Sequence, residues 1–376
     1  MTKKWSSRLT FFAFVVLMVG LGSNDSLRGI FSTIFQEHFS LTTTQLGLIV
    51  TASYIGNLVF LLVGGNLSTR FSKKRVLQVL ILIWMAALAL FAFTSNYTVL
   101  LIGMALALGS STLLNTTMNL ITPLLFATAP GFFVNFLFFT QEIGTSGSQY
   151  ILGSHADGFA FWQHTNLVLL ILGAVAFVLL LFCNVPEEAA APADAPAQKG
   201  GYDWRIIVPY VLVFGFYFIA EHGVMNWMVA YGVDGLGLPQ ASAAKYLSVF
   251  FGGMMIGRLC LSPLVDKLGA LKSLAAFGGV SCVLYLIGSL GGAVTMPVWA
   301  ISGLSFSILY PTLVMSIRLY FPAQQVSGAA GTILSIASLA DILFNVGFGK
   351  LVDMAGYAVS IRVLPLSVLA FFIVFM

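Results

Sequence analysis

The stretch Ser262-Pro-Leu-Val-Asp266-Lys267-Leu-Gly269-Ala-Leu-Lys272 ends a long apolar segment, and an earlier stretch repeats its pattern. The earlier stretch is Gly65-Asn-Leu-Ser-Thr69-Arg70-Phe-Ser-Lys73-Lys74-Arg75. In each, a small residue is followed four positions later by a polar residue, then by a basic residue and a turn. Weaker copies of the pattern occur at 153–157 and 349–353. Loops repeated after corresponding segments predict a chain made of two similar halves.

The segments between these loops are apolar enough to lie in a bilayer. Hydrophobic residues make up 59% of the chain and charged residues 8%, with a mean hydropathy of +0.98, whereas a soluble domain carries about 25% charged residues. A spanning helix needs about 20 apolar residues. On this criterion the predicted spans are 9–34, 43–67, 75–95, 98–126, 131–153, 163–184, 204–231, 241–265, 271–290, 295–318, 325–349 and 359–376. The predicted fold class is therefore an all-α membrane protein of twelve transmembrane helices in two six-helix pseudo-repeats.

The two predicted halves are joined by a linker. Residues 1–184 form the predicted N-terminal six-helix bundle, 185–203 a cytoplasmic linker rich in Pro, Ala and charge, and 204–376 the C-terminal six-helix bundle. Lys and Arg gather in alternate loops, and this bias predicts that both termini are cytoplasmic. The N-terminal apolar run lacks an Ala-x-Ala cleavage site, so it is predicted to be an uncleaved first span. The predicted location is the plasma membrane, as a multi-pass protein of a bacterial inner membrane.

Several other classes of protein do not fit the sequence. It has no Gly-x-x-x-x-Gly-Lys-Ser/Thr loop and no His-Glu-x-x-His, which argues against an ATP-driven pump and a membrane protease. Cys183, Cys260 and Cys282 stand singly in apolar stretches, a pattern that predicts neither disulfides nor a metal site. The net charge of +4 comes from Lys and Arg at segment ends and predicts no nucleic-acid partner. We expect a monomer that is not an enzyme and has no cofactor, whose partners are lipid, protons and a small-molecule substrate.

Charged residues nevertheless occur inside the predicted spans. They include Asp25, Glu142, Glu221, Arg258 and Asp341. A charge at a helix centre costs roughly 2.5–3.5 kcal/mol on insertion scales. Because such residues are retained only where they face a cavity or pair with one another, they predict a transporter with a polar pathway.

The loop at 262–272 resembles the Gly-x-x-x-Asp-Arg/Lys-x-Gly-Arg/Lys-Arg/Lys pattern of the major facilitator superfamily, and the loop at 65–74 fits it in part, with Thr69 in place of the Asp. With its six-plus-six layout, the chain is identified as a member of this superfamily over nearly its whole length. The resemblance implies a substrate site near the membrane midplane between the halves. Because the family's Asp latches a neighbouring helix, it also implies structural or gating roles for the loop residues Arg70, Asp266 and Lys267.

Shorter motifs resemble the fucose–proton symporter family. They are Asn24-Asp25, the segment 95–103, Ile256-Gly257-Arg258, Tyr310-Pro311-Thr312 and the segment 219–227, which is similar to the Gly-Ala-Glu segment of that family's glucose/galactose members. This resemblance implies transport of a monosaccharide by alternating access, with Asp25 carrying the proton and Gln141 at the position of a sugar-contacting Asn. One position departs from the family pattern. Asn115 stands where the family has a Glu that takes part in proton coupling, and an amide does not titrate.

Polar residues inside the predicted spans are the candidate binding groups. Carboxylates and amides hydrogen-bond sugar hydroxyls, and a Trp face stacks on the apolar face of a sugar. The candidate substrate-binding residues are Asn24, Asn115, Asn119, Gln141, Glu221, His222, Asn226, Trp227, Asp341 and Asn345. The candidate proton carriers are Asp25, Glu142 and Glu221.

The candidates in the first half also have structural interpretations. Asp25 is consistent with an ion pair to Arg28, and the glycines around 20–24 favour a break in the first helix where it lines a cavity. Gln141 and Glu142 point about 100° apart on a helix. Both are equally consistent with polar contacts between helices.

The candidates in the second half have structural alternatives too. Trp227 fits a membrane-interface belt. Arg258 is expected to neutralise a buried acid, such as Asp266, Glu221 or Asp341, rather than to hold a substrate carboxylate. Asp341 shares a helix face with Asn345, so it is predicted to line the cavity or to pair with Arg258.

Two other functions are compatible with these features. A drug–proton antiporter also uses a membrane-embedded acid and a large aromatic pocket, and the chain has 33 Phe and 13 Met. An uncoupled sugar facilitator needs no titrating group at Asn115. Amides near the predicted midplane favour a sugar as the substrate. The predicted function is therefore secondary active transport of a monosaccharide, coupled to protons through Asp25.

Overall fold

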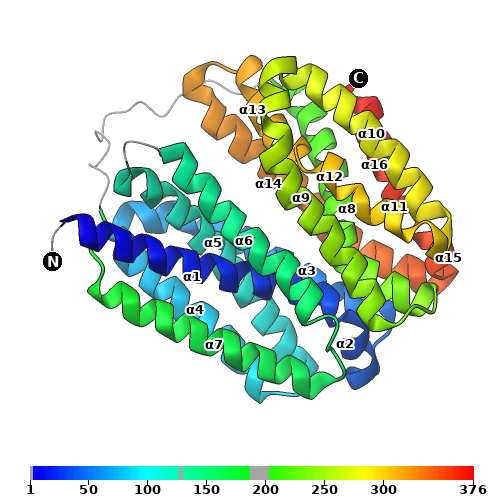
Figure 1. Cartoon of the computed structure of the whole chain (residues 1–376), viewed down its shortest axis with the longest axis horizontal. Coiled ribbons are helices and arrows are strands. Elements are labelled where there is room, and N and C mark those ends of the chain that lie inside the picture. The colour runs from blue at the N-terminus through cyan, green and yellow to red at the C-terminus, as the bar shows by residue number, and fades with distance from the viewer. Residues whose placement is uncertain (1–2, 127–129, 187–202) are drawn as a thin grey trace. The chain divides into compact units, whose positions relative to one another are not determined.

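The computed structural model describes residues 3–126, 130–186 and 203–376. Inside its helices, the side chains at 3–6, 63–70, 130–132, 135, 262, 266 and 323–328 fall outside the described residues. The described ranges are helical and contain no strand, as the predicted fold class requires (Figure 1). Most of the predicted linker, 187–202, lies outside them.

Long helices occupy the predicted spans. Among the described residues, 11 helical runs are long and apolar enough to cross a membrane, and they coincide with predicted spans. The long helices are α1 (Lys3–Ile30), α3 (Thr43–Arg70), α4 (Lys73–Phe93), α5 (Tyr97–Leu125), α6 (Pro130–Ile151), α7 (Phe159–Phe182), α8 (Trp204–Ala230), α9 (Gln240–Leu268), α10 (Ala270–Leu290), α14 (Ala323–Ala355) and α16 (Val363–Phe375). Helix α6 stands at the predicted span 131–153, but several of its side chains are not described. The count of twelve and the cytoplasmic placement of the termini therefore stay predictions.

Shorter elements complete the described chain. They are α2 (Ser32–Phe39) after α1, a π-turn η1 (Tyr231–Gly235) that extends α8, the 3-10 turn η2 (Gly292–Val294), and α15 (Tyr357–Ser360) before α16. Polar side chains cap the N-termini of several of the long helices. Ser72 accepts a hydrogen bond from the amide of Arg75 at the start of α4, and Asn96 accepts one from Val99 at the start of α5. These caps satisfy amides that have no partner inside the helix.

Two of the repeated loops turn in the same backbone conformation. Gly269 ends α9 with φ +81° and ψ 159°, and Gly356 ends α14 with φ +75° and ψ 167°. Each glycine follows the Asp of its loop, at 266 and 353, by three positions. This region of backbone space is accessible essentially only to glycine. The turn predicted for the loop at 262–272 is therefore present, and the loop at 349–353 repeats it.

The predicted span 295–318 is not one helix. It is built from α11 (Met296–Ile301), α12 (Gly303–Phe306), α13 (Leu309–Ser316) and the 3-10 turn η3 (Ile317–Leu319). The hydroxyls of Ser302, Ser305 and Ser307 donate to the carbonyls three residues earlier, which competes with helical hydrogen bonding. Pro311 has no amide to donate to the carbonyl of Ser307. The interruptions fall at Ser302 and at Ser307 and Ile308.

Helix α1 continues unbroken through 20–25, so the break expected at its glycines is wrong. Gly22 instead allows α6 to approach, because a Cβ there would overlap the carbonyl oxygen of Gln141. Thr145 donates to the carbonyl of Gly22 (3.2 Å), and Ser23 donates to that of Gly144 (3.3 Å). Small residues at a close crossing are typical of membrane helices.

The chain folds into two compact units. Unit 1 consists of Met1–Asp25, Ala52–Thr145 and Gly158–Gly201, and unit 2 of Ser26–Thr51, Ser146–Asp157 and Tyr202–Met376. In unit 1, α4 packs against α5 and α7. In unit 2, α8 packs against α14 and α16, and α9 against α11 and α12 (Figure 1). The division into bundles at 1–184 and 204–376 stays a prediction.

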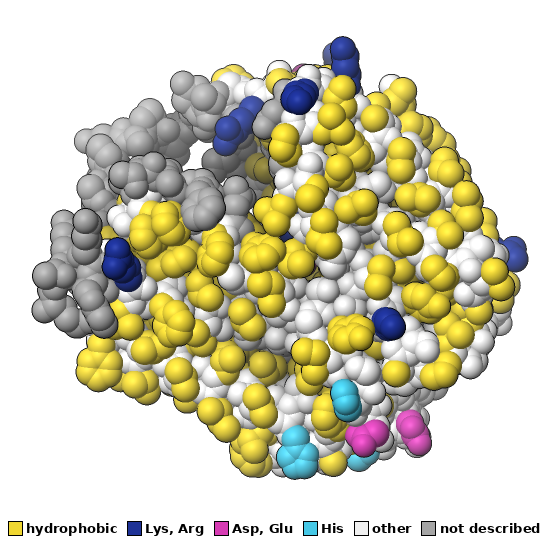
Figure 2. Space-filling model, in the orientation of Figure 1, with side chains coloured by type: hydrophobic (Ala, Val, Ile, Leu, Met, Phe, Trp, Pro, Cys, Tyr) yellow, Lys and Arg dark blue, Asp and Glu magenta, His cyan; other side chains and the backbone are white. Residues whose placement is uncertain are grey.

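Large apolar side chains cover much of the surface. Phe93, Phe182 and Leu343 are all exposed, and Figure 2 shows hydrophobic side chains over most of the face in view. Water does not solvate such a surface favourably, since monomeric soluble proteins rarely expose apolar patches larger than a few hundred Å². The surface is that of a protein whose solvent is lipid.

Candidate functional site

Unit 1 contains a chain of hydrogen-bonded amides, called the amide chain below. Asn119 Nδ2 donates to Asn115 Oδ1 (2.6 Å), and Asn115 Nδ2 donates to Gln141 Oε1 (2.6 Å). Asn115 and Asn119 lie one turn apart on α5, Gln141 lies on α6, and all three side chains are half-buried. Because each amide has more donors and acceptors than these two bonds use, the amide chain is suited to binding hydroxyl groups.

Asp25 lies beside the same face of α5. Its Oδ2 accepts a hydrogen bond from Ser111 Oγ (3.2 Å), and Ser111 precedes Asn115 by four residues, which places the two on one face. The Asp25 carboxyl is half-buried. Sequence reasoning did not include Ser111 among the candidates, although the spacing of Ser111, Asn115 and Asn119 marks a polar stripe.

Asn24 and Glu142 flank these groups. Asn24 Oδ1 accepts a hydrogen bond from Trp84 Nε1 (2.7 Å), and both side chains are buried. This bond gives Asn24 a packing role, because a buried indole N–H needs an acceptor. Glu142 follows Gln141 on α6 and is half-buried. The roles predicted for Asn24 in binding and for Glu142 in proton transfer stay predictions.

In unit 2, two side-chain hydrogen bonds link α8 to α14. His222 Nδ1 lies 2.7 Å from Asp341 Oδ2, and Trp227 Nε1 donates to Asn345 Oδ1 (2.9 Å). Asn345 Nδ2 also donates to the carbonyl of Asp341, one turn earlier. Asp341 and Asn345 therefore share a face of α14, as their spacing predicts. Trp227 is fully buried, so it belongs to the packing of unit 2 and not to an exposed interfacial belt.

Glu221 and Arg258 lie around the same two tyrosines. The charges of both act on Tyr217 and Tyr310. The ring of Tyr217 stacks on Phe306 at 5.0 Å and lies 5.9 Å from the ring of Tyr310. These residues come from α8, α9, α12 and α13, so unit 2 brings together the three motifs at 219–227, 256–258 and 310–312. Among the acids proposed for Arg258, this arrangement favours Glu221, because the side-chain hydrogen bond of Asp341 is with His222.

Arg28 is a buried cation of unit 2. Its Nη2 donates to Met225 Sδ at 4.0 Å. Its charge, with those of Glu221 and Asp341, also acts on His222. Gly29 allows this approach of α1 to α8, because a Cβ there would overlap the carbonyl oxygen of Met225. Sequence reasoning considered Arg28 only as a partner of Asp25.

The remaining candidates lie elsewhere on these elements. Asn226 is buried on α8 beside Trp227. Lys267 is exposed near the end of α9. The side chains of Arg70 and Asp266 lie outside the described residues, so the gating roles of these loop residues stay predictions.

The loop copy at 349–353 makes a contact that resembles the family's latch. Asp353 Oδ1 accepts a hydrogen bond from the amide of Thr43 (2.8 Å), and Oδ2 accepts from the amide (2.7 Å) and hydroxyl of Thr44. These amides open α3. A carboxylate at a helix N-terminus satisfies unpaired amides and complements the helix dipole.

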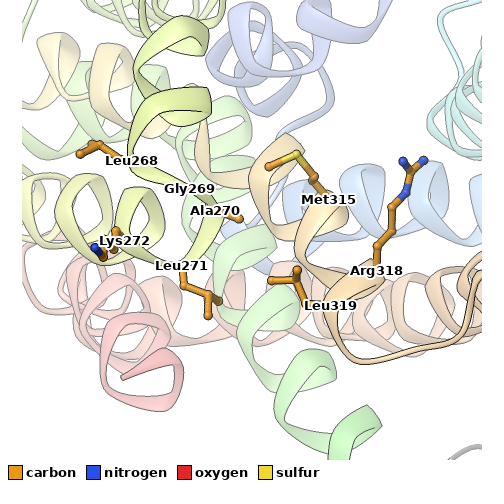
Figure 3. A pocket seen from close by; sticks show the side chains of 8 residues that line it. All are labelled: Leu268, Gly269, Ala270, Leu271, Lys272, Met315, Arg318 and Leu319. Atoms are coloured by element: carbon orange, nitrogen blue, oxygen red, sulfur yellow. The ribbon is translucent and has the colours of Figure 1, made fainter.

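A pocket of about 570 Å³ lies where α9 ends and α10 begins, against α13 and η3. Its lining is Leu268, Gly269, Ala270, Leu271, Lys272, Met315, Arg318 and Leu319 (Figure 3). The lining is mainly apolar, with Lys272 and Arg318 on opposite sides in this view. None of these residues belongs to the amide chain or to the α8–α14 bonds, so the pocket is separate from both.

The described residues hold no metal-binding group of three or more His, Cys, Asp or Glu side chains. The cysteines are free: Cys183 and Cys282 are buried, and Cys260 is exposed. Burial raises the pKa of the Cys183 thiol, which lies just after α7. A buried thiol of raised pKa is a poor nucleophile and a poor metal ligand.

An all-helical protein with a lipid-facing surface and internal polar clusters is an integral membrane protein by class. The sequence profile of the Major Facilitator Superfamily matches residues 10–345. The chain therefore belongs to this superfamily, as a multi-pass membrane transporter and not an enzyme.

Individual relatives and a solved structure agree with this assignment. The L-fucose-proton symporter of Escherichia coli (strain K12) is 24% identical over 333 residues, covering 77% of this chain and 75% of that protein. The glucose/galactose transporter of Brucella abortus biovar 1 (strain 9-941) is 27% identical over 344 residues, covering 85% and 81%. A crystal structure of the superfamily transporter FucP in the outward conformation aligns over 98% of each chain with a TM-score of 0.68 at 20% identity. The structural likeness establishes the fold.

Proposed function

We propose that this transporter moves a monosaccharide across a bacterial inner membrane by alternating access, coupled to protons through Asp25. The observation that carries the proposal is the amide chain of Asn119, Asn115 and Gln141 in unit 1. Neutral amides bind hydroxyls as both donors and acceptors without selecting for charge. The names of the two relatives, a fucose symporter and a glucose/galactose transporter, support the same class of substrate.

Unit 2 supplies groups of complementary chemistry. Glu221 is a half-buried carboxylate able to accept hydrogen bonds from two hydroxyls at once. Tyr310 is half-buried beside it and offers an aromatic face for the apolar side of a sugar ring. The charges of Arg258 and Glu221 act on the same two tyrosines, Tyr217 and Tyr310. The role of Arg258 in this proposal is therefore to balance the charge of Glu221.

The proton role of Asp25 follows from its position in α1. It is an ionisable group in a membrane span, and such groups mark proton or substrate pathways. Its bond to Ser111 places it on the α5 face that carries the amide chain. Protonation of Asp25 removes a charge from that face. This lowers the free energy of the occluded conformation through which the transporter passes.

The test is uptake of labelled hexoses into proteoliposomes with and without an imposed proton gradient, acidic outside. We expect accumulation above the external concentration only with the gradient, and its collapse on adding a protonophore. A sugar acid and a lipophilic cation are included as competitors. Inhibition by the cation but by no hexose would contradict the proposal and favour a drug–proton antiporter.

An uncoupled sugar facilitator is the second candidate, and one observation favours it. Asn115 replaces the acid that the fucose–proton symporter pattern carries, and its side chain is engaged on both sides by amides. In that case the gradient has no effect, and internal sugar equals but never exceeds external sugar. The same uptake experiment separates the two.

A further inference from the structure

The pair of His222 and Asp341 in unit 2 is not needed by the sugar-binding scheme above. His222 Nδ1 and Asp341 Oδ2 are 2.7 Å apart, with side-chain exposures of 23% and 2%. The second carboxylate oxygen, Oδ1, is buried and has no hydrogen-bond partner among the described residues. A buried acid with one oxygen on an imidazole and the other without a partner is costly to keep unless it performs a task.

The geometry defines what the pair does with a proton. With Nδ1–H donating to Asp341, a neutral His222 gains and loses its proton at Nε2. The pair then has two charge states: a neutral imidazole with a carboxylate, of net charge −1, and an imidazolium with a carboxylate, of net charge 0. Only the second presents no net charge to the interior of a membrane protein.

Charged groups from three helices surround the imidazole. They are Asp341 on α14, Glu221 on α8 and Arg28 on α1. Burial of the ring and the guanidinium oppose the imidazolium, and the two carboxylates favour it. The ring also stacks on Phe218, with centroids 5.4 Å apart and planes at 6°, which stabilises a cation over an aromatic face.

The pair is connected to the packing of unit 2. Asn345 donates to the carbonyl of Asp341 and accepts from Trp227, which lies on α8 five residues after His222. A change of charge at His222 therefore affects both side-chain hydrogen bonds between α8 and α14, His222–Asp341 and Trp227–Asn345.

We propose that His222 and Asp341 form a second proton-binding site, which must be protonated for the transporter to change conformation. This proposal rests on the proposed function for its substrate, and it is distinct from coupling through Asp25. Protonation cancels the net charge of the pair, so reorientation is fast when His222 is charged and slow when it is not.

The first test is counterflow exchange of the transported hexose between pH 5 and 8.5, which needs no gradient. Wild-type exchange is expected to fall at high pH by about tenfold per pH unit, the slope for one required proton. His222→Gln keeps a donor to Asp341 but fixes the net charge at −1, so exchange is slow at every pH. The double variant His222→Gln/Asp341→Asn is neutral at every pH and is expected to restore exchange and remove its pH dependence.

Two controls make the result specific. His164 is exposed on α7, and His164→Gln should keep the wild-type profile. His155 is exposed after α6, and His155→Gln should keep it too. A pH-independent wild type, or a double variant as slow as His222→Gln, would overturn the proposal.

The second test does not depend on sugar transport. The chain has 4 histidines, so the imidazole resonance of His222 in isotope-labelled protein is assignable from its loss in His222→Gln. This resonance is expected to titrate between pH 5 and 8.5. The midpoint of its titration is expected to shift by at least half a pH unit in Asp341→Asn. Failure to titrate rules out the pair even if the hexose is transported. Titration without any hexose transport contradicts the proposed substrate and leaves the proton site standing.

Discussion

At the scale of single residues, the structure separates polar groups that bind one another from polar groups with capacity to spare. Asn24 is engaged by a buried indole, and Trp227 and Asn345 are engaged with each other. Asn115, Gln141 and Glu221 are half-buried and retain unused donors or acceptors. The residue types predicted all of these as candidates equally, because composition carries no information about burial. The buried partner, not the residue type, decides which of them is available to a substrate.

We predict that Asn115→Ala weakens hexose binding more than a change at the neighbouring Thr116 of α5 does. The substitution removes the central amide and both of its hydrogen bonds. Hydrogen bonds of this kind contribute about 0.5–1.5 kcal/mol each, so a loss of roughly tenfold in Kd is expected by calorimetry. Thr116→Ala is the matched control, because Thr116 is exposed and bonds only within its own helix. Equal losses in the two variants would show that the amide chain does not contact substrate.

We predict that Glu221→Gln weakens hexose binding more than Arg258→Lys does. A carboxylate accepts two hydroxyl bonds, and hydrogen bonds to charged groups contribute about 1.5–3 kcal/mol. Arg258→Lys keeps the charge that balances Glu221. Calorimetric titration of both variants checks the order. A larger loss in Arg258→Lys would assign the substrate contact to the guanidinium instead and would favour an anionic substrate.

At the scale of helices, the loop copy at 349–353 caps the N-terminus of α3. Asp353 binds the first amides of α3 through three hydrogen bonds. We predict that Asp353→Asn, which accepts with one oxygen only, destabilises the protein by about 0.5–2 kcal/mol, the range for helix caps. The thermal unfolding midpoint should fall by about 1–3 °C, because the shift per kcal/mol becomes smaller as the chain becomes longer.

The equivalent aspartate of another loop copy is the control for this change. Asp157 is exposed at the end of the copy at 153–157. Asp157→Asn should leave the midpoint unchanged. If both variants melt together with the wild type, the contact of Asp353 with α3 carries no net stability.

Much at this scale was predictable, and the exceptions have physical causes. Span positions follow from apolar length, and the turn that contains Gly269 follows from the loop pattern at 262–272. The interrupted helix at 296–319 was not predicted, because its apolar content is that of a span while its serines break the backbone pattern. The continuity of α1 was missed for the opposite reason, since its glycines serve contact with α6 and not a break. The pairing of His222 with Asp341 joins residues far apart in the chain, and no local pattern encodes it.

At the scale of the whole molecule, the question is how proton binding and sugar movement are linked. A ligand shifts a conformational equilibrium only by its differential affinity for the two states. In unit 1, Asp25 on α1 bonds Ser111, which lies on the α5 face that carries Asn115 and Asn119. In unit 2, the His222–Asp341 pair links α8 to α14. Gradient-driven accumulation and gradient-free exchange therefore report on different proton sites. The first requires a proton that moves with the sugar, and the second requires only that the carrier changes conformation.

The Asp25→Asn variant separates these functions. An asparagine at position 25 cannot carry a proton, so we predict that accumulation of labelled hexose against its gradient is abolished at pH 6. Counterflow exchange at the same pH should stay within about twofold of the wild type, because binding and alternating access do not need Asp25 to titrate. Accumulation that survives in Asp25→Asn would make Asp25 a structural residue. A wild type that never accumulates hexose would make the protein a facilitator, and the amide at Asn115 in place of the family's acid would then be the physical reason.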